Sequence, residues 1–139
     1  MRRIEGFPLW IGNARDAREL RGVHELGIEA IFDLAVEEPP IPTTRELIYL
    51  RFPLHDDDSN SPVLLRTLRD TLETVVGNLI PTLIACSAGM SRSPAIAAVI
   101  VSQFMGVSPE EALRHVSAGA AVDVSPGLWK SLLANRYGR

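Results

Sequence analysis

Residues 81–106 read PTLIACSAGMSRSPAIAAVIVSQFMG and carry the strongest structural signal in the chain. The apolar run Pro81–Ala85 is typical of a short buried strand, and a polar loop containing Gly89 follows it. Residues 93–105 then predict a helix that is apolar nearly all round and therefore buried, and Gly106 ends it. A strand, a tight loop and a buried helix in this order indicate an α/β protein.

Strands and helices also alternate on both sides of this stretch. Three further strands are predicted at Pro8–Ile11, Ile28–Ala35 and Leu47–Leu54. A helix is predicted after the cap Asn13, with Ala17, Leu20, Val23 and Leu26 in helical period and Gly27 at its end. A second is predicted from Ser61-Pro62 to Gly77-Asn78. Two more are predicted to begin at a capping box, Ser108–Glu111, and at Ser125-Pro126. The alternation predicts an α/β fold in which helices pack against a central sheet.

Length, composition and charge narrow the class of protein. The chain has 139 residues, of which 46% are hydrophobic and 22% charged, so we expect one folded domain over residues 1–139. A net charge of −3 disfavours nucleic acid as a partner, and a single cysteine excludes an internal disulfide and a zinc site of several thiolates. The chain start lacks a signal-peptide core and no apolar run approaches a membrane span, so we expect a cytoplasmic protein without a membrane partner. We also expect a monomer.

The loop Cys86–Ser93 combines residue types that bind oxyanions. A tight turn between a strand and a helix directs successive backbone N–H groups inward, and the helix N-terminus adds partial positive charge. Gly89 permits a positive φ, and Arg92 has a planar fork of donors that can hold two phosphate oxygens. The same surroundings stabilise a thiolate on Cys86. The alternative is that Cys86 is a buried structural thiol and Arg92 a surface residue.

The spacing from Cys86 to Arg92, with Gly89 between them and Ser93 after them, resembles the signature loop of cysteine-dependent protein tyrosine phosphatases. The helix sequence SRSPAIAAVIV and the segment Leu9–Ala14 resemble the dual-specificity branch of that family. The likeness covers nearly the whole chain and implies a single compact catalytic domain of the dual-specificity type. The implied fold is α/β, with a mixed, mostly parallel central sheet of four to five strands flanked by about five helices. It also implies hydrolysis through a phosphocysteine intermediate, with no metal and no other cofactor.

By position in the motif, the resemblance gives each loop residue a role. Cys86 is the implied nucleophile, Arg92 the phosphate clamp, and Ser93 the hydroxyl that stabilises the leaving thiolate. The implied phosphate-binding loop comprises Ser87, Ala88, Gly89, Met90, Ser91 and Arg92. Ala85 departs from the family pattern, which has histidine before the cysteine, and Ser125–Trp129 lacks the asparagine and glutamine often found near the last helix. We therefore expect lower activity and a different placement of the attacking water.

The leaving alcohol needs a proton, which the family takes from an aspartate on a loop before the cysteine. Asp56 follows the predicted strand Leu47–Leu54 at the matching place, thirty positions before Cys86, and is the expected general acid, with Asp57 and Asp58 as alternatives. Repulsion among three adjacent carboxylates favours keeping one of them protonated. The structural alternative is a solvated loop that leads to the cap at Ser61. We expect no metal site at this triplet, because no distant carboxylate or histidine cluster supports one.

Several other conspicuous side chains have plainer interpretations. His55 could contact substrate, although a histidine at a strand end is more often packed or solvated. Trp10 and Trp129 are expected to pack in or at the rim of the core. Arg45 and Arg51 flank the predicted strand before Asp56 and are expected in solvent, unless an anionic substrate reaches them.

Other enzymes with a similar loop fit the chain less well. Low-molecular-weight phosphatases and arsenate reductases place the loop near the N-terminus, and such reductases need further cysteines. Rhodanese-like sulfurtransferases match the Arg92-Ser93 ending less well. The alternative from a different class is a phospho-binding module with little turnover, which Ala85 would favour.

The charge of the loop bears on the substrate. Arg92 is the only cation of the loop, whereas relatives that act on inositol lipids or RNA ends carry extra basic residues there. This favours an ester with one phosphate, in a phosphorylated protein or a small molecule. We expect phosphotyrosine first, and phosphoserine or phosphothreonine second.

Overall fold

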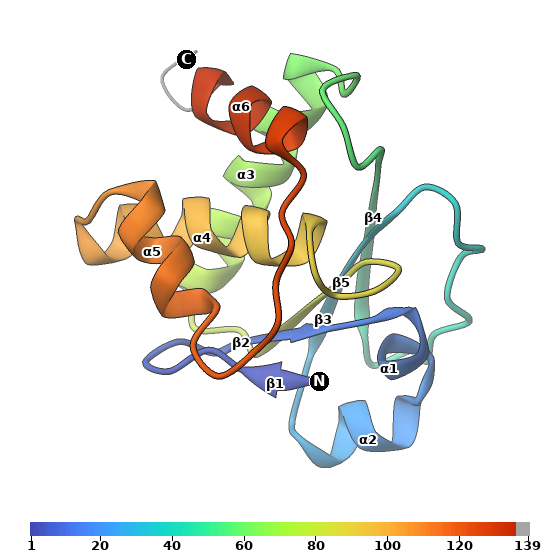
Figure 1. Cartoon of the computed structure of the whole chain (residues 1–139). Coiled ribbons are helices and arrows are strands. Elements are labelled where there is room, and N and C mark those ends of the chain that lie inside the picture. The colour runs from blue at the N-terminus through green and yellow to red at the C-terminus, as the bar shows by residue number, and fades with distance from the viewer. Residues whose placement is uncertain (136–139) are drawn as a thin grey trace.

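Helices and strands alternate along residues 1–135, which are the residues that the computed structural model describes (Figure 1). Their order is β1 (Arg2–Arg3), β2 (Leu9–Gly12), α1 (Ala14–Arg18), α2 (Leu20–Glu25), β3 (Ala30–Ala35), β4 (Ile48–Leu54), α3 (Pro62–Gly77), β5 (Thr82–Ala85), α4 (Arg92–Met105), α5 (Pro109–Val116) and α6 (Pro126–Asn135). The four predicted strands are all present, with bounds within two residues of those expected from the sequence.

The sheet has five strands in the order β1-β2-β5-β3-β4. The pairs β2–β5, β5–β3 and β3–β4 are parallel, and β1 joins β2 antiparallel at one edge. The predicted mixed, mostly parallel sheet is therefore confirmed. Because the four parallel strands run the same way, the loops that follow them emerge at one edge of the sheet, where ligands bind in open α/β folds.

Helices cover both faces of the sheet (Figure 1). Alternate residues of the strands pack to opposite sides: Ile11, Phe32 and Ile84 belong to a large cluster with the helices α3 to α6. Trp10, Ile31 and Leu83 belong to a smaller cluster with α1 and α2. Strands buried on both faces need nearly continuous apolar sequence, which explains the composition of β3 and β5.

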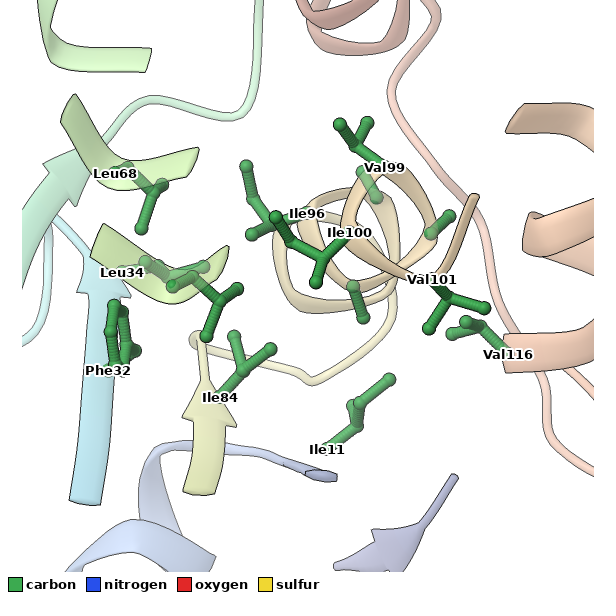
Figure 2. Packing of buried hydrophobic residues seen from close by; sticks show 14 of the residues in the cluster. Ile11, Phe32, Leu34, Leu68, Ile84, Ile96, Val99, Ile100, Val101 and Val116 are labelled. Carbon is green, nitrogen blue, oxygen red and sulfur yellow. The ribbon is translucent and has the colours of Figure 1, made fainter. Parts of the chain in front are cut away.

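Helix α4 lies at the centre of the larger cluster. Figure 2 shows Ile96 of α4 on the side of Leu68 of α3, and Ile100 directed toward Ile84 of β5. Val101 lies next to Val116 of α5. Every residue of α4 from Arg92 to Ser102 is buried, as the apolar sequence predicts. Phe104 and Met105 in the last turn are 46% and 43% exposed, so the prediction of burial fails at this end.

The N-terminal half of the chain differs from expectation in two places. The single helix predicted after Asn13 is two short helices, because Glu19 between them has a non-helical backbone (φ −83°, ψ 73°). This break raises the number of helices to six within residues 1–135. Leu26, which the predicted helical period included, lies at the end of α2 and is 47% exposed. Strand β1 was not predicted, because two charged residues carry no apolar pattern.

No helix within residues 1–135 is long and apolar enough to cross a lipid bilayer. The longest helix is α3, which has 16 residues and a polar outer face.

Candidate active site

The loop 86–91 joins the end of β5 to the start of α4, at the carboxyl edge of the parallel strands. Both elements are buried where they meet the loop, so its two ends are fixed in the core. Gly89 has a φ of +74°, and a Cβ there would lie 3.1 Å from the carbonyl carbon and oxygen of Gly12. Backbone conformation and the close approach of β2 thus both require glycine.

Cys86 is nearly enclosed, with 3% of its surface exposed. The amide N–H of Gly89 donates to Cys86 Sγ at 3.2 Å. The amide N–H of Cys86 itself donates to the Gly12 carbonyl at 3.4 Å, which ties the loop to β2. An amide directed at the sulfur, beside the N-terminus of α4, suits a negatively charged thiolate.

The guanidinium of Arg92 is held by a carboxylate from another part of the chain. Its Nη1 and Nη2 donate to Oε1 and Oε2 of Glu37, each at 2.6 Å, and Nη1 also donates to the Leu54 carbonyl at 2.9 Å. These hydrogen bonds lower the pKa of Glu37 to about 2 and raise the pKa of Arg92. Both groups are therefore charged at neutral pH, and the plane of the guanidinium is fixed.

Ser91, the last residue before α4, connects the loop to two other segments. Its hydroxyl donates to Asp56 Oδ1 at 2.6 Å and accepts the amide N–H of Ser125 at 2.8 Å. The amide of Asp123 donates to the Met90 carbonyl at 2.8 Å. The loop after β4 and the segment before α6 therefore both lie against the cysteine loop.

A cavity of about 310 Å³ lies beside this loop. Its lining consists of Glu37, Asp56, Cys86, Ser87, Ala88, Met90, Ser91, Arg92 and Asp123. The structure thus brings Cys86, Arg92 and Asp56 to one cavity, as expected from the sequence. Ser93, in the first turn of α4, does not line the cavity, and its fully buried hydroxyl has no hydrogen-bond partner in residues 1–135.

The two aspartates next to Asp56 do not line the cavity. Asp57 Oδ1 accepts hydrogen bonds from the amide and the hydroxyl of Ser59, and these bonds lower the pKa of Asp57. Asp58 is exposed. Of the three carboxyl groups, Asp56 alone lines the cavity. Residues 1–135 contain no group of three histidine, cysteine or acidic side chains that could hold a metal ion.

Arg51 was expected in solvent, and this prediction is wrong, because its side chain is only 23% exposed. It contacts the buried carboxylate of Asp33 and the carbonyls of Ala35, at the end of β3, and of Glu38. Arg45 and His55 are exposed, as expected for solvated side chains, and neither lines the cavity. Trp10 and Trp129 pack against the two apolar clusters.

Sequence reasoning did not single out Glu37, Glu38 or Asp123. Glu38 accepts a hydrogen bond from Ser87 Oγ at 2.7 Å, so both glutamates contact the cysteine loop. A signal for them existed, because they directly follow β3, and the ends of neighbouring parallel strands meet at one edge. Using it required the position of β3 beside β5, which the sequence alone does not provide.

No family model and no curated protein sequence matches the chain, but solved structures do. Human DUSP28 has a TM-score of 0.81 at 23% identity, over 94% of this chain and 92% of that one. A mouse protein described as a dual-specificity phosphatase, complexed with zinc tungstate, has a TM-score of 0.81 at 26% identity, over 94% and 83%. The human tyrosine phosphatase-like serine/threonine/tyrosine-interacting protein has a TM-score of 0.77 at 18% identity, over 91% and 89%.

These likenesses extend over nearly the full length of this chain and of the proteins compared with it. They agree with the resemblance seen at the cysteine loop and at the start of the chain. The chain has the fold of the cysteine-dependent protein tyrosine phosphatase superfamily, in its dual-specificity branch.

Proposed function

We propose that the chain is a phosphatase that hydrolyses phosphate monoesters through a phosphocysteine intermediate. The observation that carries this proposal is the meeting of Cys86, Arg92 and Asp56 at one cavity. They supply a nucleophile, an oxyanion clamp and a proton donor, the set of groups that this reaction needs. The mouse structure complexed with tungstate, a tetrahedral oxyanion like phosphate, gives further support.

In the proposed first step the Cys86 thiolate attacks phosphorus, the bond to the leaving oxygen breaks, and Asp56 protonates that oxygen. In the second step water attacks the phosphocysteine, Asp56 takes its proton, and Cys86 leaves as a thiolate with release of phosphate. Backbone N–H groups and Arg92 hold the phosphoryl oxygens. The buried Ser93 hydroxyl, which lacks a partner within the described residues, is the proposed donor to the leaving thiolate.

Ala85 favours the second candidate function, a phospho-binding module with little turnover. It occupies the position where the family carries histidine, and it is buried among apolar residues. One similar structure is described as phosphatase-like. We place turnover first because Cys86, Arg92 and Asp56 are all present at the cavity.

The charges around the cavity support a substrate with one phosphate. Its lining includes the carboxylates of Glu37, Asp56 and Asp123, and its one cation, Arg92, is already paired. A second phosphate would meet carboxylates rather than basic groups. We therefore propose phosphotyrosine first, and phosphoserine or phosphothreonine second, in a phosphorylated protein or a small monoester. That residues 1–139 act as one monomeric cytoplasmic domain is part of the same proposal.

Hydrolysis of p-nitrophenyl phosphate by the full-length chain, after exhaustive chelation, tests the proposal. We expect the wild type to turn over the substrate. Cys86→Ser should lose turnover but keep tungstate binding. Arg92→Ala should lose both, because without the guanidinium only the backbone donors remain to hold the oxyanion. Substantial turnover by Cys86→Ser would exclude the covalent route. Tungstate binding without turnover by the wild type would favour the phospho-binding module, and a requirement for added Mg²⁺ or Zn²⁺ would contradict a metal-independent reaction.

A further inference from the structure

Arg51 of β4 donates hydrogen bonds to the backbone at the end of β3 and in the segment that follows it. Its Nη2 lies 3.1 Å from the carbonyl oxygen of Ala35 and 2.6 Å from that of Glu38, with the carbonyl of Val36 at 3.5 Å. One guanidinium therefore contacts the carbonyls of residues 35, 36 and 38, and the Ala35 carbonyl also accepts the amide N–H of Glu38 at 3.2 Å. We call this segment the 35–38 strap.

A buried carboxylate holds Arg51 in place. Asp33 is 4% exposed, and its Oδ2 accepts from Arg51 Nη1 at 3.2 Å and from the Tyr49 hydroxyl at 2.5 Å. A buried carboxylate needs such partners, so the side chain of Arg51 is fixed at its far end as well as by the strap. The guanidinium is thus a rigid link between the sheet and the strap.

The strap contacts the cysteine loop at two points. Glu37 grips Arg92 through two hydrogen bonds of 2.6 Å, and Glu38 accepts the Ser87 hydroxyl at 2.7 Å. These contacts lie at the two ends of the loop, next to Cys86 and at the start of α4. A shift of the strap would therefore move both ends of the phosphate-binding loop.

The hydrogen bonds from Arg92 to Glu37 determine which N–H donors of Arg92 remain available for a ligand. A guanidinium has five N–H groups. Glu37 takes one from each Nη, and the Leu54 carbonyl takes the second of Nη1. The two that remain, on Nε and Nη2, point the same way and form a fork that matches two oxygens of one phosphate.

We propose that Arg51 is a positioning residue of the phosphate site: it fixes the 35–38 strap, so that Glu37 holds Arg92 with its Nε–Nη2 edge free for the phosphoryl oxygens. This inference rests on the proposed function only in needing an oxyanion site at the cavity. It does not need turnover. Without the strap, Glu37 and Arg92 would still attract each other, but the orientation of the guanidinium would no longer be fixed.

The test measures tungstate binding by calorimetry in the full-length chain, with Cys86→Ser present throughout so that no covalent chemistry intervenes. Arg51→Lys keeps a positive charge beside Asp33, but one ammonium group cannot contact Asp33 and the strap carbonyls at the same time. This variant should therefore weaken tungstate binding roughly tenfold. Glu37→Gln should weaken binding by a similar factor. The double variant Arg51→Lys/Glu37→Gln should bind no more weakly than Glu37→Gln alone, because both changes act through the same contact. Arg45→Lys, at an exposed arginine away from the cavity, is the matched control and should leave binding unchanged.

Thermal unfolding of every variant will show whether a substitution impairs folding. A second variant at Arg51 keeps the test valid if Arg51→Lys does so. Asp33→Asn/Arg51→Gln replaces the buried ion pair by a neutral pair and leaves no charge unpaired, yet it also releases the strap, so it should lose affinity like Arg51→Lys. In chains without Cys86→Ser, Arg51→Lys should raise KM for p-nitrophenyl phosphate. Unchanged tungstate affinity in both Arg51 variants, or losses that add in the double variant, would overturn the inference while leaving the proposed function intact. Absence of tungstate binding in the Cys86→Ser parent would overturn the inference and the oxyanion site together.

Discussion

At the scale of single residues, Glu37 should make the stability of the protein depend on pH in strong acid. Arg92 lowers the pKa of Glu37 to about 2, whereas an unfolded glutamate titrates near ~4.3. A lowered pKa stabilises the fold at every pH above the unfolded value, and this stabilisation is lost as the pH falls from about 4 through 2. The Glu37 side chain is half exposed, so we expect only about 0.5–1 kcal/mol, the range for partly solvated ion pairs.

Urea unfolding of the wild type and Glu37→Gln at pH 7, 4 and 2 measures this difference. The free energies of unfolding should differ at pH 7 and converge at pH 2. Glu46→Gln, at an exposed glutamate, is the control and should show no such convergence. A gap between wild type and Glu37→Gln that persists at pH 2 would show that packing, rather than charge, accounts for the effect.

The three adjacent aspartates can be separated in the same way. Asp56 lines the cavity, whereas the carboxylate of Asp57 accepts hydrogen bonds from the amide and the hydroxyl of Ser59. Asp56→Asn should lower kcat for esters of poor leaving groups by about 10²–10⁴-fold and flatten the basic limb of the pH profile, because the leaving oxygen loses its proton donor. Asp57→Asn should leave both close to wild type. The reverse result would assign the acid to the neighbouring position.

At the scale of elements, α3 ends in a turn that normally uses glycine. The amide of Leu79 donates to the Val76 carbonyl and that of Ile80 to the Val75 carbonyl, which is the Schellman arrangement. Leu79 carries the positive φ of this turn, 59°, although its side chain is 73% exposed. Leu79→Gly should therefore stabilise the protein by about 1 kcal/mol.

Leu26→Gly is the matched control for this change. Leu26 is also an exposed leucine at a helix end, but its φ is −80° and the positive φ belongs to Gly27. Glycine at position 26 should destabilise by about 0.5–1 kcal/mol, because it relieves no strain and adds disorder to the unfolded chain. Thermal unfolding of both variants gives the two signs, and destabilisation by Leu79→Gly would mean that contacts of the leucine side chain outweigh the strain.

The elements themselves show how far sequence reasoning reaches. The apolar run of β5 and the all-round apolar α4 are local patterns, and both were predicted almost to the residue. The contact of Glu37 with Arg92 joins positions 55 apart and depends on β3 lying between β4 and β5. Strand order is set by packing of the whole sheet, which no local pattern records. Arg51 was assigned to solvent for the same reason, since its partners lie on a neighbouring strand.

At the scale of the whole molecule, the negative charge should oppose the approach of phosphate esters. The chain has a net charge of −3, and three carboxylates line the cavity. Salt screens such repulsion, so kcat/KM for a dianionic aryl phosphate should rise roughly twofold between 10 and 150 mM NaCl. Asp123→Asn removes one exposed carboxylate from the cavity wall and should reduce the rise. A fall of kcat/KM with salt would instead indicate a basic approach path.

The Cys86 thiolate of the proposed mechanism would also react with peroxide that enters the cavity. Cys86 Sγ takes an oxygen atom from the oxidant and becomes a sulfenic acid, while the peroxide is reduced to water. The chain has no second cysteine to convert this product into an internal disulfide. The sulfenic acid therefore either closes onto a backbone nitrogen or is oxidised further and irreversibly, unless an external thiol reaches it. In the proposed mechanism that thiol enters by the same cavity as the substrate, so a bound phosphate ester would shield the sulfur from damage and equally delay its repair.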